Sequence, residues 1–257
     1  MNSVDHPRQF LPPFVLTGVV LTLMAVLTIG LAGLGTRWGW WSFRTGLGML
    51  RWGTVAVGAT LLITIVASLF TRGTERRRSF VAATVITAMG IAVASVPVLM
   101  ARVARAVPPI HDITTDFENP PSFVALREKR TGALNSIDYG GPAVASLQRA
   151  SYPDIGPLVL PLPPARVMEN AVGVARELGW AIVAVDTAAG QIEATARTRW
   201  FGFRDDVAVR VTPNASGSRV DVRSVSRVGK SDLGANARRI RTFLIRLHDS
   251  AVSATSS

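Results

Sequence analysis

The sequence predicts a membrane-anchored α+β protein, with three transmembrane helices followed by a two-layer sandwich. The sandwich is expected to have the order α-β-β-β-β-α and an antiparallel four-stranded sheet. Three observations predict this class. The 257-residue chain has a high mean hydropathy of +0.31, its longest apolar runs gather in the first hundred positions, and helical and strand periodicities follow one another after residue 165.

The three apolar runs, at residues 14–34, 53–70 and 80–100, contain no Asp, Glu, Lys or Arg. Each is close to the roughly 20 residues that cross about 30 Å of hydrocarbon as a helix. The first run is too long for a signal peptide and lacks a small-residue cleavage site, and two further runs follow it. We therefore expect three retained helices in a membrane anchor of residues 1–106. Since transporters usually need ionisable groups inside the membrane, an anchor is favoured over a transporter.

The arginine distribution predicts the orientation. Four arginines lie within the nine residues 71–79, and short basic loops of this kind lie in the cytoplasm. This places the N-terminus inside, and it places the loop 36–52 and the chain after Met100 outside. The loop 36–52 and the residues just after Met100 also carry arginines, which weigh against this orientation. A tryptophan cluster in the loop 36–52 is typical of an anchor at the headgroup level.

Composition excludes several function classes. The formal net charge of +11 comes from 28 basic and 17 acidic residues, but no basic run is long enough to indicate a nucleic-acid site. The chain has no cysteine, which excludes disulfides, thiolate catalysis and cysteine-ligated metals. We expect no metal and no cofactor.

Residues 107–164 are expected to form an irregular lead-in packed on the domain, because the segment is rich in proline and in turn-forming runs. The α+β core is expected at 165–250, followed by a disordered tail at 251–257. Apolar residues at helical spacing predict its first helix, which ends before Gly179. Short turns predict an antiparallel meander of strands. The expected strands are 180–186, 191–200, 205–212 and 218–227, and the last helix is 233–250.

The second strand alternates Ile192, Ala194 and Ala196 with Glu193, Thr195 and Arg197. This period of two predicts a sheet with one face against the core and one face in solvent.

Gly229-Lys230-Ser231, just before the last helix, raises the question of a phosphate-binding loop. That motif requires a glycine at the position of Ser224, so a nucleotide site is not expected. Two interpretations remain open. Asp232 or Ser231 caps the helix, or the N-terminal end of the helix forms a polar or anionic ligand site. The second interpretation uses Arg227, Lys230, Asn236 and Arg239.

Two other segments carry candidate chemistry. In the connection 197–206, Trp200 and its aromatic neighbours either cap the core or form a platform beside Asp205 and Asp206 for a partner or the membrane. In the segment 108–123, acidic residues beside His111 suggest a cation site or acid–base chemistry, but their spacing fits neither an EF-hand loop nor the H-E-x-x-H motif. An extended segment held by side-chain turns is the expected structure there.

The stretches "IHDITTDFENPPSF", "YPDIGPL" and "TRWFGFRDDVAVRV…SRVDVRSVSRVGKSDLGANARRIRTFL" resemble the uncharacterised domain-of-unknown-function family 1499 (DUF1499), over about residues 108–247. The family is known from bacteria and plastids. The resemblance implies a small extracytoplasmic or lumen-side domain, with no established activity, ligand or catalytic residue. The family-like positions suggest one shared polar surface. They are Asp112, Thr115, Asp116, Trp200, Asp205, Asp206, Arg227, Ser231, Asp232 and Asn236, and with Lys230 and Arg239 they are the candidate ligand- or partner-binding residues.

The expected protein is a non-enzymatic envelope protein of the bacterial inner membrane. Its extracytoplasmic domain is expected to bind a protein partner or a small polar or anionic ligand at the bilayer surface. The alternative is a hydrolase or transferase that uses Asp112 and Asp116 with Asp205 and Asp206, with Arg227 as an anion clamp. A pocket that gathers these carboxylates would favour the enzyme, and a flat polar face would favour the binding protein.

Overall fold

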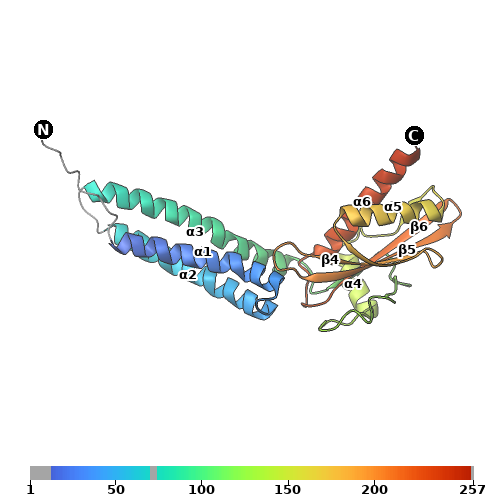
Figure 1. Ribbon diagram of the computed structural model, residues 1–257, viewed down its shortest axis with the longest axis horizontal. Helices are drawn as coiled ribbons and strands as arrows, with labels where there is room; N and C mark the ends of the chain where they lie inside the picture. Colours follow the sequence, from blue (N-terminus) through green and yellow to red (C-terminus); the bar gives the residue numbers. More distant parts are fainter. Residues whose placement is uncertain (1–12, 70–73, 256–257) are drawn as a thin grey trace. The chain divides into compact units, whose positions relative to one another are not determined.

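A computed structural model of the chain describes residues 13–69 and 74–255 (Figure 1). The chain divides into two compact units, a helical unit and a domain unit, each of which is described by itself. The helical unit is Met1–Arg102 with Trp200–Gly202, and the domain unit is Val103–Arg199 with Phe203–Ser257.

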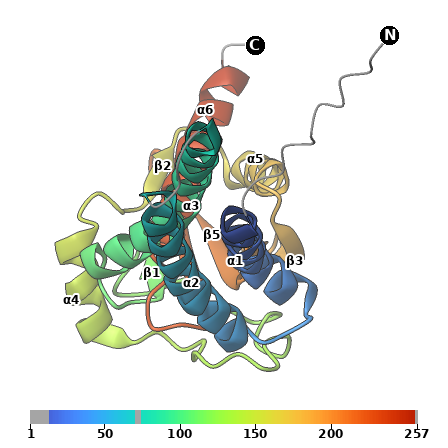
Figure 2. The same ribbon diagram turned by 90° about the vertical axis from the view of Figure 1, so that its left-hand side faces the viewer.

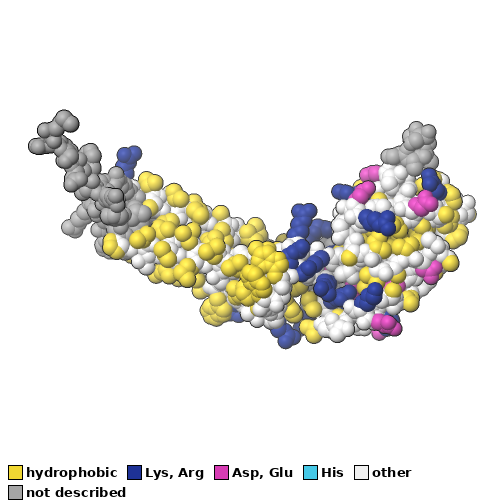
Figure 3. All heavy atoms as spheres, in the orientation of Figure 1, with side chains coloured by type: hydrophobic (Ala, Val, Ile, Leu, Met, Phe, Trp, Pro, Cys, Tyr) yellow, Lys and Arg dark blue, Asp and Glu magenta, His cyan; other side chains and the backbone are white. Residues whose placement is uncertain are grey.

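Three long helices make up the helical unit: α1 (Pro13–Trp38), α2 (Phe43–Leu69) and α3 (Thr74–Ala106), whose last residues belong to the domain unit. Their outward side chains are largely hydrophobic (Figure 3). The prediction of three apolar helices long enough to span a membrane is confirmed by length and composition. The qualifying stretches are Leu16–Trp38, Phe43–Val66 and Phe80–Ala106.

Small and hydroxyl side chains lie between the helices. The hydroxyls of Thr22 on α1 and Thr60 on α2 are 3.3 Å apart and buried. Thr60 also donates to carbonyls of its own helix. Gly90 on α3 lies against the side chain of Leu61 on α2, where a Cβ atom would come within 2.9 Å. Small residues at such contacts let helix backbones approach closely, as in the packing of membrane helices.

The helix boundaries differ from the expected ones. The loop expected at 36–52 is reduced to residues 39–42, because α2 begins at Phe43. Trp41 folds back on α1, where its indole Nε1 donates to the carbonyl of Ala32 at 3.1 Å. Of the basic connection expected at 71–79, residues 74–79 belong to α3, and the rest, like the N-terminus, lies outside the described residues.

An antiparallel sheet is the centre of the domain unit, with the strand order β1-β6-β5-β4-β3, and β2 also pairs with β6. Figure 2 shows β1 and β3 at opposite edges. The four expected strands are present as β3 to β6, and two strands of three residues each were not expected. The strands are β1 (Asp112–Thr114), β2 (Leu158–Leu160), β3 (Ala181–Asp186), β4 (Gln191–Arg197), β5 (Arg204–Asn214) and β6 (Gly217–Ser226).

Two helices cover one face of this sheet: α5 (Pro164–Glu177) and α6 (Ala235–Thr255). Trp180 stacks on Phe243 at 5.0 Å between ring centroids, in a core with the valines of β5 and β6. The helix α6 continues through residues 251–255, which were expected to be disordered, and 256–257 lie outside the described residues.

The opposite face of the sheet was expected to be wet, and this prediction was wrong. Residues 115–140 of the lead-in lie over it, with Phe123, Leu126 and Ile137 packed on Ala208 and Val225. Glu193 is therefore only 3% exposed. The two-layer sandwich thus carries an additional irregular layer. We call this side of the sheet the covered face.

The lead-in also contains a helix that the proline-rich pattern did not predict, α4 (Gly141–Ser151). The side chain of Gln148 on α4 is fully buried and accepts from the amide of Thr114 at 3.0 Å. Its Nε2 donates to the carbonyl of the same residue at 2.7 Å. The Gln148 amide thus pairs with the outer side of β1 as a neighbouring strand would.

Candidate functional site

Polar side chains of β4, β5 and β6 meet on the covered face. Strand alternation points every second residue of these strands away from α5 and α6. The lead-in segment then removes these residues from water, so each charge needs a partner. The residues are Glu193, Thr195, Asp206, Arg210, Asp221, Arg223 and Arg227.

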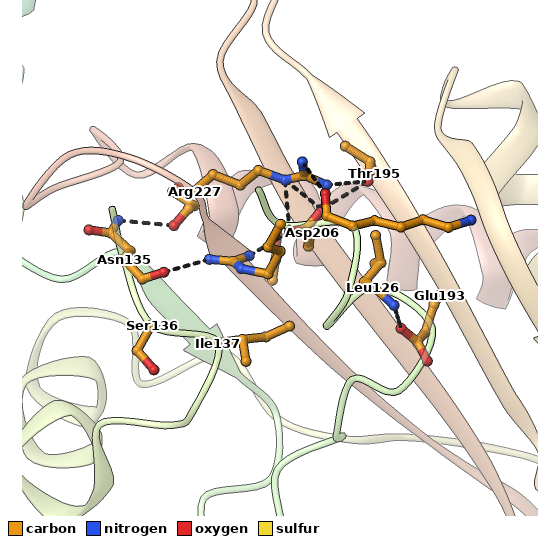
Figure 4. Close-up of polar contacts among 12 residues, drawn as sticks. Leu126, Asn135, Ser136, Ile137, Glu193, Thr195, Asp206 and Arg227 are labelled. Carbon is orange, nitrogen blue, oxygen red and sulfur yellow. Dashed lines mark hydrogen bonds and ion pairs between the residues drawn. The ribbon is translucent and has the colours of Figure 1, made fainter. Parts of the chain in front are cut away.

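Asp206 is the centre of the most buried group (Figure 4). Its carboxylate accepts from Arg227 Nη2 at 2.9 Å and Nε at 3.0 Å, from Thr195 Oγ1 at 2.8 Å, and from Arg130 Nη1 of the lead-in. Two guanidinium groups face one carboxylate, so this group has one excess positive charge. Burial lowers the pKa of Arg130, and the charge of Asp206 opposes this effect.

The same two arginines fix the lead-in to the sheet. Arg227 Nη1 donates to the carbonyl of Lys129 at 3.0 Å, and Arg130 Nη2 donates to that of Asn135 at 2.9 Å. The Asn135 side chain donates to the carbonyl of Gly229 at 2.9 Å. Lead-in, β6 and the loop after β6 are thus joined at one end of the sheet.

A second buried ion pair joins β1 to β6. Arg223 donates to Asp112 from Nη2 at 2.7 Å and from Nε at 3.0 Å. Its guanidinium lies 5.2 Å from the ring centroid of Phe123 and 5.4 Å from that of Tyr139. Burial, together with the nearby Asp112 charge, raises the pKa of Tyr139 to about 12.

Asp116 and Asp221 share the guanidinium of Arg210, at 2.8 and 3.1 Å. Asp221 also pairs with Arg219 at 2.8 Å and accepts from Thr115 Oγ1 at 3.1 Å. Burial of Asp116 favours its neutral form, but backbone amides of the following turn and Arg210 prevail and lower its pKa.

Asp205 lies on the other face of the sheet, under α6. It pairs with Arg239 Nη2 at 2.6 Å. Asn236, fully buried, accepts from Ser224 Oγ at 2.7 Å and donates to the carbonyl of His111 at 3.0 Å. Asp205 and Asp206 are therefore separated by the sheet, although they are adjacent in sequence.

The loop 228–234 enters α6 through a cap. The Asp232 carboxylate accepts from the amides of Gly234 at 2.8 Å and Asn236 at 2.6 Å. Ser231 Oγ accepts from the amide of Leu233 at 3.3 Å, and Leu233 has a left-handed φ of 54°. Burial raises the pKa of Asp232 despite these amides. Asp232 thus occupies the helix end proposed for an anion.

The candidate residues fall into separate groups. Asp112, Thr115, Asp116, Asp206 and Arg227 lie on the covered face. Asp205 lies on the other face, with Asn236 and Arg239 of α6. The segment around His111 contacts the loop 228–234 through Ser231 Oγ, which donates to the carbonyl of Pro108 at 3.3 Å, and it contacts the start of α6 through Asn236. Trp200 belongs to the helical unit. Among the described residues, no three His, Asp or Glu side chains are placed to hold a metal ion.

Sequence reasoning missed several members of these groups. Arg130, Asn135, Glu193, Thr195 and Arg223 were not candidates. Arg223 and Glu193 stand at alternate positions of predicted strands, so their strand positions were available from the sequence. The roles of Arg130 and Asn135 could not be predicted, because no sequence pattern shows that the lead-in pairs with a strand 76 residues away.

Comparison with known proteins identifies the family. The model of DUF1499, described as a protein of unknown function, matches residues 112–247, which is more than half of the chain. No curated protein matches the sequence. Matching solved structures include protein CV1439 from Chromobacterium violaceum, with 11% sequence identity and a TM-score of 0.24 over 37% of this chain and 94% of that one. The family match begins at the first residue of β1 and ends within α6, and it confirms the resemblance seen in the sequence. The chain belongs to the DUF1499 family.

Proposed function

We propose that this DUF1499 protein is a multi-pass membrane protein whose domain works as a binding module at the bilayer surface. The main observation that supports this proposal is the short connection between α3 and the domain. The last turn of α3, Val103–Ala106, belongs to the same compact unit as the sheet, and residues 107–111 alone separate it from β1. Five extended residues reach at most about 18 Å. A membrane that takes up α3 therefore keeps the domain at its surface.

The carboxylates support binding rather than hydrolysis. Asp112, Asp205 and Asp206 are each at most 4% exposed and each paired with a guanidinium. A general base or nucleophile needs access to a substrate proton or carbon, and these groups are occupied. Of the four carboxylates that the hydrolase or transferase alternative would combine, Asp205 pairs with Arg239 of α6 on the other face of the sheet, away from the three on the covered face.

The proposed location is the bacterial inner membrane, with the N-terminus in the cytoplasm and the domain outside. The arginines of residues 71–79 support this orientation. The partner in this proposal is a protein or a small polar ligand that meets the domain at the membrane.

Fractionation and reporter fusions test the proposal. The full chain, expressed in a bacterium, is expected to stay in the membrane pellet after alkaline carbonate extraction. A C-terminal alkaline phosphatase fusion is expected to be active, and a C-terminal green fluorescent protein fusion dark. Release by carbonate would refute membrane integration, and the reverse reporter pattern would refute the orientation alone.

A further inference from the structure

Three basic residues, Lys129, Arg204 and Lys230, lie around the end of β6, and their side chains have no ion partner among the described residues. The buried Arg227 brings two of them together. Its amide donates to the carbonyl of Arg204 at 3.0 Å, and its Nη1 donates to the carbonyl of Lys129 at 3.0 Å. Lys230 follows three residues later in the loop. All three side chains are exposed. Within residues 13–69 and 74–255, no carboxylate forms a salt bridge with any of them. We call Lys129, Arg204 and Lys230 the basic rim.

Several exposed arginines elsewhere on the domain differ from the rim because they have acidic partners. Arg166 pairs with Glu169 and Arg241 with Asp154. Charge on those surfaces is locally balanced. At the rim it is not, and the buried group beneath it adds the excess positive charge of Arg130 and Arg227 over Asp206. The end of the sheet that carries the rim therefore presents positive charge that no salt bridge among the described residues balances.

The rim lies at the end of the sheet where the chain arrives from α3. The amide of Ser226, the last residue of β6, donates to the carbonyl of His111 at 2.9 Å, just before β1. Ser231, next to Lys230, donates to the carbonyl of Pro108. Arg105, in the last turn of α3, is exposed and has no salt bridge among the described residues. That turn ends a candidate membrane span, so in the proposed membrane arrangement residues 107–111 tether the domain that carries the rim to the end of the span.

We propose that the basic rim binds the phosphate groups of anionic phospholipids in the membrane that holds the helices. This proposal rests on the proposed function and names its ligand class. The two lysines supply mobile point charges, and Arg204 supplies a planar fork that matches phosphate oxygens. Basic residues near an anionic surface each contribute about 1 kcal/mol, a factor of about five in binding. The buried carboxylates then act to hold the rim in place.

The test uses the full chain in lipid nanodiscs. Because the chain has no cysteine, one introduced cysteine carries one fluorophore. Leu134→Cys labels the rim, since Leu134 is exposed and its amide donates to the carbonyl of Arg227 at 2.9 Å. Ala215→Cys labels the turn between β5 and β6, at the other end of the sheet. Nanodiscs of phosphatidylcholine, with or without phosphatidylglycerol, contain a lipid with a quencher on its headgroup.

Phosphatidylglycerol is expected to increase quenching at residue 134 several-fold and to leave residue 215 unchanged. The variant Lys129→Gln, Arg204→Gln, Lys230→Gln is expected to lose this increase. A control variant with Arg166→Gln, Arg176→Gln and Arg246→Gln removes equal charge from α5 and α6 and is expected to keep it.

Each other outcome overturns the proposal. Equal quenching with and without phosphatidylglycerol means that the rim does not bind anionic lipid in preference to phosphatidylcholine. Loss of the increase in both triple variants means that only overall charge matters. A chain that does not insert into nanodiscs at all refutes the proposed function instead, so the two failures are distinguishable. The rim substitutions are all at exposed side chains, and thermal unfolding of each variant checks that the domain is intact.

Discussion

Arg227, which directly follows β6, forms an ion pair with Asp206 of β5 in which the carboxylate has no contact with solvent and the arginine is only 9% exposed. Arg130 reaches the same carboxylate from the lead-in. The pair therefore joins three parts of the chain through one buried charge, and its consequences for stability can be measured.

Asp206→Ala is expected to lower the free energy of unfolding by about 3–5 kcal/mol, because it leaves two buried guanidiniums without their counter-charge. Thermal or denaturant unfolding of the full chain in detergent measures this. Asp154→Ala is the matched control, since it breaks an exposed pair with Arg241 and is expected to cost less than about 1 kcal/mol. Similar losses in both variants would contradict the buried role of Asp206.

Arg223→Lys is expected to destabilise the domain by about 1–3 kcal/mol, because an ammonium group cannot make both bonds to Asp112 or stack between two rings. Arg241→Lys is the control: Arg241 also makes two bonds to a carboxylate, Asp154, and lies 5.4 Å from the ring of Tyr152. That pair is partly exposed, so a small loss is expected. If the two lysine variants lose the same free energy of unfolding, burial is not the reason for the contribution of Arg223 to stability.

Glu193→Gln is expected to loosen the lead-in. The carboxylate accepts from three consecutive amides, those of Val124, Ala125 and Leu126, at 2.8, 3.0 and 2.8 Å. A glutamine has one oxygen and an NH₂ group that would face an amide donor. Hydrogen exchange of these three amides should rise at least several-fold, with β5 unchanged. Unchanged protection would mean that packing alone holds the segment.

The raised pKa of Asp232 leads to a prediction for how the free energy of unfolding changes with pH. Burial raises its pKa above 3.8, so the folded chain binds the proton more tightly than the unfolded chain. Its contribution to the free energy of unfolding is then fully present below pH 3.8 and declines as the pH rises through the raised value. The loss caused by Asp232→Ala should therefore be larger at the acidic end of this window.

The free energy of unfolding is measured for the wild type and for Asp232→Ala over a pH series. In the difference between the two, the contributions of other titrating groups largely cancel. Asp205 and Arg239 are the charges that act on Asp232, so Lys230→Ala is a control that changes a nearby exposed charge without touching the cap. A loss that grows with pH would show that the amide bonds, not burial, dominate.

Periodicity predicted the helices and strands that are long enough to show it. The apolar repeat of α5 and α6 and the alternation of β4 to β6 are properties of seven or more residues. β1 and β2 have three residues each and cannot display a period of two. The helix α4 begins with Gly141 and Pro142, which in sequence are indistinguishable from a turn.

The site was less predictable, because its pairs join distant parts of the chain. The partner of Asp206 in the lead-in depends on how residues 115–140 fold over the sheet, which no local pattern encodes. One error was avoidable. Adjacent residues of a strand point to opposite faces, so Asp205 and Asp206 could not have formed one carboxylate pair.

The pairing of Gln148 with Thr114 has a consequence for assembly. The unpaired amides and carbonyls of an edge strand are a template for another chain, and this side chain occupies both groups of Thr114. Strand addition at β1 would first have to displace a buried glutamine. At the opposite edge, β3 has no strand neighbour beyond it among the described elements. Overproduced or partly unfolded protein is therefore expected to associate through β3.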